Sequence, residues 1–302
     1  MAIDSVKALV NGTWHTLAYD SSSGTYKATI TAPGATSYNL AGGYYNVQIK
    51  ATNKAGTSAT ADGSTLSGLR LVVKETVKPV ITILSPTLGA KVTNDKQPVI
   101  FTVIDEEGGS GIDLSSLVVK LDGAAVASST ITTTAITNGY SVTYTPASAL
   151  SNGNHTVEVS VSDNDGNAAT AKSTTFTVDT VPPTLNITSP AEGLITATAS
   201  VSVVGTTNDA TSSPVSVSVK LNGTDQGTVT VESNGSFSKT VTLAAGENTI
   251  VVTATDSSGL SSSVTRKVTL DTSVPVITSA AITPNPVDAG ATVVISIVIS
   301  EE

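Results

Sequence analysis

Alternating apolar and polar residues recur along the whole chain and predict β-strands. In residues 157–161 and 293–299 every second side chain is Val or Ile, and side chains two apart share one face of a strand. The chain is rich in Val, Ile, Thr and Ser and shows no sustained helical period. The pattern therefore predicts an all-β chain built from many short strands.

The predicted strands recur in a unit of roughly 100 residues. Each unit combines an opening strand led by proline with a mid-unit strand that ends in Asn-Gly or Asp-Gly. The opening prolines are Pro79, Pro183 and Pro275, and the turn pairs begin at Asn11, Asp122 and Asn222. Asn-Gly and Asp-Gly favour a two-residue hairpin, because both central residues of a type I′ turn take positive φ. About seven short strands per unit predict an antiparallel sandwich of two sheets.

The turns late in each unit indicate the kind of sandwich. Residues 52–56, 162–166 and 255–259 are turns that end in Gly after an alternating strand, and residues 176–180 and 268–272 lead into the linkers. At these segments the chain resembles bacterial immunoglobulin-like repeats. The resemblance implies tandem immunoglobulin-like antiparallel β-sandwiches in an extended rod.

The repeat also predicts the domain boundaries. We expect an incomplete domain over residues 1–76 that begins at its third strand, C. Complete domains follow over residues 77–180 and 181–272. Residues 273–302 then carry only strands A and B of a further unit, the two strands that the first domain lacks.

The two ends of the chain are complementary in this alignment. Residues 298–302 match residues 103–107, and the pair Ile3-Asp4 matches Ile112-Asp113. We therefore predict that the C-terminal hairpin completes the N-terminal sandwich of another copy, as in donor-strand complementation, and gives a ring or a filament. A cut from a longer array of repeats is the alternative. The residues expected at the contact are Val293, Ile295, Ile297 and Ile299 on the tail and Val6, Ala8 and Val10 on the head.

Aromatic residues are concentrated in the first unit. If residues 10–13 form a hairpin, Trp14 shares a face with Leu9, opposite to the face of Val10. An exposed Trp beside an exposed Leu favours a contact surface for a subunit or a sugar ring, and packing over the sandwich edge is the alternative.

Acidic residues in predicted loops suggest calcium as the one plausible cofactor. The loops at one end of each sandwich should bring together Asp179, Asp209 and Asp256 at one linker, and Glu75, Asp105 and Asp163 or Asp165 at another. Calcium takes six to eight oxygen ligands, which carboxylates and carbonyls can supply. The alternative is that these Asp residues serve only to form turns.

Composition excludes several function classes. A formal charge of −9 and scattered basic residues argue against a nucleic-acid partner. The chain has no Cys, its longest apolar run is too short to span a bilayer, and its N-terminus lacks a secretion-signal pattern. His15 and His155 accompany no recognisable catalytic constellation, so we expect no enzymatic activity.

Three segments suggest a biological setting. Residues 6–14, 42–47 and 284–287 resemble immunoglobulin-like proteins of prophage tail regions in Gram-positive bacteria. The resemblance implies a virion or tail structural protein, made in the cytoplasm and acting in the virion or outside the cell, with itself and other virion proteins as partners. The alternatives are a surface adhesin that binds a bacterial glycan, and a spacer fragment of a larger surface protein.

Overall fold

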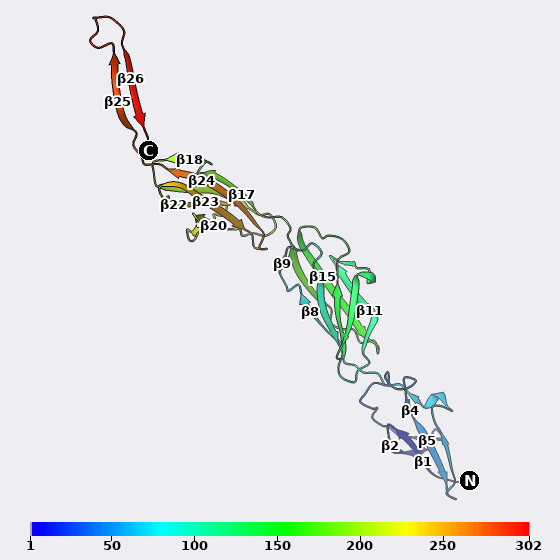
Figure 1. Cartoon of the computed structure of the whole chain (residues 1–302). Coiled ribbons are helices and arrows are strands. Elements are labelled where there is room, and N and C mark those ends of the chain that lie inside the picture. The colour runs from blue at the N-terminus through cyan, green and yellow to red at the C-terminus, as the bar shows by residue number, and fades with distance from the viewer. Residues whose placement is uncertain (1, 302) are drawn as a thin grey trace. The chain divides into compact units, whose positions relative to one another are not determined.

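The computed structural model describes residues 2–301 and is all-β (Figure 1). Its only helical elements in that range are two 3-10 turns, Ser67–Leu69 and Ser128–Thr130. The chain divides into two compact units, one ending at Val178 and the other starting at Asp179. Within the first unit we distinguish a first module (residues 2–76) and a second module (77–178). Within the second unit we distinguish a third module (179–272) and a C-terminal hairpin (273–301).

The second module is a complete two-sheet sandwich. One sheet has the order β13-β14-β10-β8 and the other the order β12-β11-β15-β16-β9, with only the β16–β9 pair parallel. The strands are β8 (Val80–Ser85), β9 (Ala90–Val92), β10 (Val99–Ile104), β11 (Ile112–Leu121), β12 (Ala124–Ala125), β13 (Ile131–Ile136), β14 (Gly139–Tyr144), β15 (Gly153–Asp163) and β16 (Lys172–Val178). Alternate residues of both sheets meet in one core, in which Phe101 and Phe176 are the largest fully buried side chains.

The third module repeats this arrangement. Its sheets have the orders β17-β19-β22 and β18-β24-β23-β20-β21, again with one parallel pair, β18–β24. The strands are β17 (Thr184–Ser189), β18 (Leu194–Thr196), β19 (Ser200–Asn208), β20 (Ser216–Leu221), β21 (Thr224–Asp225), β22 (Ser236–Thr242), β23 (Gly246–Thr255) and β24 (Ser261–Leu270). Its core contains Phe237, Ile250 and Val252.

The first module has one large sheet, of order β3-β2-β1-β5-β6, and a separate two-stranded pair, β4–β7. The strands are β1 (Ile3–Val10), β2 (Thr13–Asp20), β3 (Thr25–Lys27), β4 (Tyr45–Asn46), β5 (Gln48–Asn53), β6 (Ser58–Ala61) and β7 (Arg70–Leu71). The large sheet corresponds to β12-β11-β15-β16 of the second module. Within the described part of the chain, this module has no counterpart of the sheet that contains β8 and β10.

The predicted hairpin turns are present in all three modules. Asn11, Asp122 and Asn222 have φ of 46°, 51° and 49°, and the glycine after each also has positive φ. These are the values of a type I′ turn, so the Asn-Gly and Asp-Gly pairs fix the register of the strands they join. That register decides which side chains face the core.

The C-terminal hairpin consists of β25 (Val276–Thr283) and β26 (Val294–Ser300), drawn in red in Figure 1. They pair only with each other among the described strands. Val276 pairs with Ser300, as Val80 pairs with Ile104 and Thr184 with Asn208. In all three cases the partners are 24 residues apart and a one-residue shift follows along the pair, so the hairpin has the pairing of strands A and B in a complete module. This pairing places Ile299 at the position of Val103, so the sequence alignment of residues 298–302 with residues 103–107, which followed the shared Val-Ile letters, is wrong by one residue.

Candidate assembly and cation sites

The core face of the first module is incompletely covered. Val6, Ala8 and Val10 of β1 lie on this face and are 7%, 9% and 5% exposed. The residue that pairs with Ala8 is Ile49, which is only half-buried. The matching residues of the complete modules are Val159, paired with Val119, and Val252, paired with Val219, and both are 0% exposed.

The incomplete cover leaves an apolar hollow of about 310 Å³ in the first module. Its wall includes residues of β1, of β7 and of segments that form no strand. The apolar residues of that wall are Ala8, Val10, Ile30, Ala32, Val47, Leu69 and Leu71. Residues 28–44 form no strand, whereas the corresponding region of the second module contains β14, which pairs with β10. The first module therefore lacks both the neighbour and the apolar side chains that β8 and β10 supply in the second.

The C-terminal hairpin has apolar side chains that no other part of the chain covers, among the described residues. Val293, Ile295, Ile297 and Ile299 are 41%, 65%, 53% and 60% exposed. Because Ile277 pairs with Ile299 as Ile81 pairs with Val103, the isoleucines of β26 occupy the positions of β10 residues that are 0% exposed: Val99, Phe101 and Val103. The hairpin thus exposes the side chains that would be buried in a complete sandwich.

Trp14 lies on the other face of the first module's sheet. It is directly opposite Leu9 in the β1–β2 pair and is 44% exposed, while Leu9 is half-buried. Tyr19 is an odd number of residues away on the same strand and therefore faces the opposite side, where its ring lies 5.2 Å from that of Tyr26. The aromatic residues of the first module consequently do not form one continuous platform.

Three aspartates come together at one end of the third module. Asp179 precedes β17, Asp209 follows β19 and Asp256 follows β23, and each offers a carboxylate oxygen within 4.8 Å of the others. Their exposed fractions are 0%, 7% and 5%. These are the three aspartates that the predicted loops were expected to bring together.

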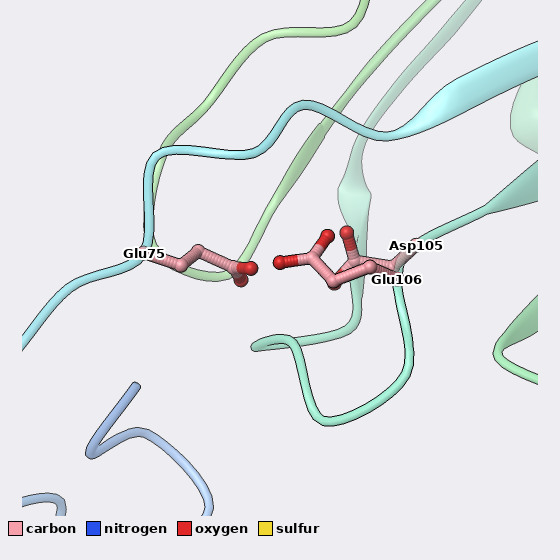
Figure 2. Close-up of side chains that lie close together, drawn as sticks. All are labelled: Glu75, Asp105 and Glu106. Atoms are coloured by element: carbon pink, nitrogen blue, oxygen red, sulfur yellow. The ribbon is translucent and has the colours of Figure 1, made fainter. Parts of the chain in front are cut away.

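The corresponding cluster of the second module differs from the sequence prediction. Glu75 and Asp105 do approach each other, but the third member is Glu106, and not Asp163 or Asp165 (Figure 2). Asp163 accepts hydrogen bonds from Asn167, and Asp165 accepts one from the Thr36 hydroxyl of the first module at 2.5 Å. Sequence reasoning placed the third acid in the loop after β15, whereas it directly follows Asp105.

Electrostatics in this second cluster favour a shared proton. The hydrogen bond to the Glu75 carboxylate, together with burial, raises the pKa of Glu106 to about 7. Burial opposes ionisation of Glu75, but its hydrogen bonds from Glu106 and Ser110 outweigh burial and lower its pKa. A carboxylic acid paired with a carboxylate is thus the favoured state of Glu75 and Glu106 below neutral pH.

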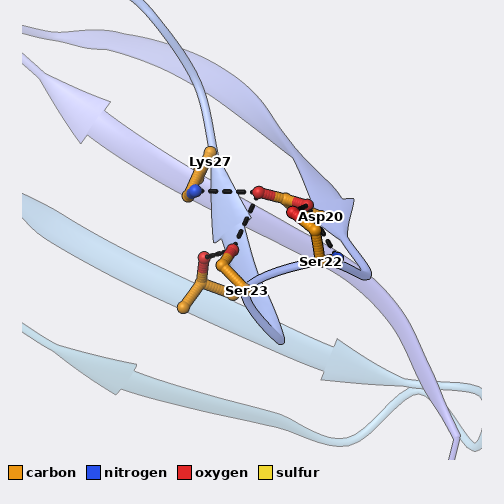
Figure 3. A network of polar contacts seen from close by, with 5 residues as sticks. Asp20, Ser22, Ser23 and Lys27 are labelled. Atoms are coloured by element: carbon orange, nitrogen blue, oxygen red, sulfur yellow. Dashed lines mark hydrogen bonds and ion pairs between the residues drawn. The ribbon is translucent and has the colours of Figure 1, made fainter.

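Two further polar groups shape the modules: Asp20, which the sequence pattern did not indicate, and His155, which the sequence offered only as a histidine without catalytic partners. Asp20, at the end of β2, accepts hydrogen bonds from Lys27, Ser22 and Ser23, which hold its pKa well below the ordinary range (Figure 3). His155 is buried, with Nδ1 2.8 Å from Asp122 Oδ2 and Nε2 2.8 Å from the Ser151 carbonyl. Burial alone would lower the pKa of His155, but the bonds to these two acceptors raise it.

Comparisons with known proteins agree with this fold. Residues 88–180 match the family model of a bacterial Ig-like domain, and residues 183–272 match the model described as glucodextranase, domain B. The second name refers to one domain of a glucodextranase and carries no activity over to this chain. A search of curated protein sequences finds no match.

Solved structures with several such modules are also similar. The fibronectin(III)-like modules of Clostridium thermocellum CbhA are 16% identical over 64% of this chain and 94% of theirs, with a TM-score of 0.40. Sidekick-1 immunoglobulin domains 1–5 are 12% identical over 99% of this chain and 60% of theirs, also at 0.40. A tetra-tandem repeat from the extending region of a large adhesion protein is 19% identical over 98% of this chain and 79% of that chain, at 0.33.

The architecture and the bacterial Ig-like match confirm the predicted fold class, an all-β chain of tandem immunoglobulin-like repeats. Among the described residues, no helix is long and apolar enough to cross a membrane.

Proposed function

We propose that this chain is a non-enzymatic structural protein that assembles head to tail by β-strand complementation. The C-terminal hairpin of one copy enters the open face of the first module of another copy and supplies its strands A and B. The observation that carries the proposal is the match between the two parts: a hairpin paired as strands A and B, and a sandwich that lacks those two strands.

Burial of the hairpin provides the driving force. Each isoleucine of β26 that passes from half-exposed to buried stabilises the complex by roughly 1 to 2 kcal/mol, and three of them share one face. Pairing of β26 with residues 28–32, which form no strand in the single chain, would also satisfy backbone groups of both segments. The costs of association and ordering offset part of this gain.

The setting proposed for the assembly is a phage virion or another extracellular fibre. The likeness of residues 6–14 and 42–47 to prophage tail proteins supports it, and bacterial Ig-like domains are often extracellular. A glycan-binding adhesin is the second candidate, favoured by the exposed Trp14 beside Leu9. For that candidate, binding to cell-wall polysaccharide should be lost in Trp14→Ala while assembly is retained.

The test is a pair of substitutions on opposite faces of one strand. Ile297→Asp places a charge on the face that would be buried, and Val298→Asp places the same charge on the other face of β26. Mass photometry of the purified chain over a range of concentrations should show oligomers for the wild type and for Val298→Asp. Ile297→Asp should remain monomeric at the same concentrations. Its dissociation constant should be at least about 100-fold higher, because a loss of about 3 kcal/mol of binding free energy changes a dissociation constant by roughly that factor.

Two results would overturn the proposal. One is that Ile297→Asp assembles as well as the wild type. The other is that the wild type stays monomeric at every concentration, either with a protease-sensitive hairpin or with a hairpin protected within its own chain. The melting transitions of the second and third modules serve as the folding control, since the exposed hairpin does not contribute to their cores.

A further inference from the structure

In Asp179, Asp209 and Asp256 one carboxylate oxygen, Oδ1, accepts hydrogen bonds from nearby backbone amides. Asp179 Oδ1 accepts a hydrogen bond from the amide of Val181 at 3.1 Å. Asp209 Oδ1 accepts from the amides of Thr211 and Ser212 at 2.8 and 2.5 Å.

Asp256 follows the same pattern. Its Oδ1 accepts hydrogen bonds from the amides of Ser258 and Leu260 at 2.7 and 3.1 Å, and another from the Ser258 hydroxyl at 2.7 Å. All three Oδ1 atoms therefore serve the local turns, as the turn-forming alternative requires.

In two of these carboxylates the second oxygen, Oδ2, takes no part in the turn. Oδ2 of Asp179 and Oδ2 of Asp256 are buried and accept no hydrogen bond within the described part of the chain. The hydroxyl of Ser212, a residue that is 0% exposed, is also without a partner there. Buried carboxylates are strongly disfavoured unless a counter-charge or hydrogen-bond donors neutralise them. Oxygens left unpartnered beside a third carboxylate are the donors that a cation requires.

We infer that Asp179, Asp209 and Asp256 bind one calcium ion at this end of the third module. The cluster offers only oxygen donors, which select hard cations, and the third module contains neither His nor Cys. The carboxylate oxygens of the cluster all lie within 4.8 Å of one another, inside the span of roughly 5 Å that one calcium ion bridges at about 2.4 Å. Magnesium keeps several water ligands and is seldom held by a cage of protein groups alone, so this cluster favours calcium. Carbonyl groups and water complete the coordination.

This inference is independent of head-to-tail assembly, since all three residues lie in one module of one chain. The site would fasten the segment before β17 to the two loops that follow β19 and β23, so calcium should stabilise the third module. Asp→Asn substitution retains the Oδ1 acceptor that each turn needs and removes the negative charge. It therefore separates a turn role from a calcium role.

The test uses the full chain after dialysis against a chelator, with calcium and magnesium titrated by calorimetry and melting followed in parallel. We expect Asp256→Asn and Asp179→Asn each to weaken calcium binding at least tenfold. Without calcium, both variants should melt at a higher temperature than the wild type, because a charge is removed from a repelling cluster. With calcium the order should reverse.

The matched control is Asp225→Asn, which changes an exposed aspartate of β21 whose Oδ1 also accepts a hydrogen bond from a nearby backbone amide, that of Gly227. It should leave calcium binding and both melting temperatures as in the wild type. The inference is overturned if the wild type binds no calcium, if Asp256→Asn binds it as tightly, or if calcium does not raise the melting temperature of the third module. Equal stabilisation by magnesium would overturn the assignment of the ion.

Discussion

Shortening one side chain at the same structural position in each module measures how complete each core is. Val159, Val252 and Ile49 occupy this position, each opposite a core-facing residue of the neighbouring strand. The two valines are 0% exposed and Ile49 is half-buried. The three sites therefore occupy the equivalent strand and register but differ in how completely they are covered.

The expected costs follow from burial. Val159→Ala and Val252→Ala each remove two methyl groups from a closed core, and transfer plus cavity terms give about 2 to 3 kcal/mol. Ile49→Ala removes three carbons, which would cost about 2 to 5 kcal/mol in a closed core. In the dispersed chain that site is already partly open to water, so we expect only about 1 kcal/mol there.

The assay is hydrogen exchange of the full chain, resolved into peptides of each module, in an Ile297→Asp background that keeps it dispersed. Each substitution should lower the opening free energy of its own module by the amount given. Repeated in the assembling wild-type background, Ile49→Ala should become as costly as the two valine substitutions or more so. A cost of 3 kcal/mol for Ile49→Ala in the dispersed chain would refute the reasoning, because the first module would then close its own core.

Two further predictions concern the complete modules. His155 has a raised pKa, so its contribution to stability is fully present below the unfolded-state value near 6.5 and is lost as pH rises through the folded value. The melting temperature of the second module should therefore fall by a few degrees between pH 6 and 9. The fall should be smaller in the Asp122→Asn/His155→Asn variant, in which Glu106, whose pKa is raised to about 7, still titrates over that range. Gly205→Ala should destabilise the third module by about 1 to 3 kcal/mol, because its Cβ would lie 2.4 Å from the Asn186 carbonyl oxygen. Gly34→Ala, where nothing lies within 4 Å, is the control, and equal melting of the two variants would contradict the packing argument.

The sequence specified the strands well because the signals are local. The Asn-Gly pair at Asn11 determines a hairpin, and that hairpin determines that Val10 faces the core while Leu9 and Trp14 face the other side. Period and turn chemistry suffice for such features, which depend on few contacts. They did not suffice for the register of the C-terminal hairpin: the sequence alignment matched residue 298 to residue 103, whereas the pairing of β25 with β26 places Ile299 at that position.

Features that depend on loop paths were harder to foresee. The loop after β15 turns Asp163 toward Asn167 and Asp165 toward Thr36, and the carboxylate that joins Glu75 and Asp105 comes from Glu106. Adjacent residues in a strand point to opposite faces, but Asp105 and Glu106 already lie beyond β10, so that rule does not separate them. The hollow beside Ala8 likewise depends on how residues 28–44 are laid out without strands.

The acidic clusters and the strand deficiency have a common origin in the repeat. Glu75, Asp179 and Asp271 each stand four residues before an opening proline, and Asp105, Asp209 and Glu301 each stand next to the end of strand B. The C-terminal hairpin with its linker therefore carries two of the three acid positions, and a first module completed by it would gain both.

The third position is where the modules diverge. In the third module it is Asp256, in the second it is replaced by Glu106, and in the first it is Asn53, whose Oδ1 accepts from the amides of Ala55 and Thr57. An amide carries no charge, so the completed first module would have only two carboxylates at this end. We expect it to bind calcium more weakly than the third module, and Asn53→Asp in the assembled chain to strengthen that binding. The same substitution in dispersed Ile297→Asp chains should have no such effect, because the two acids would then be absent from the first module.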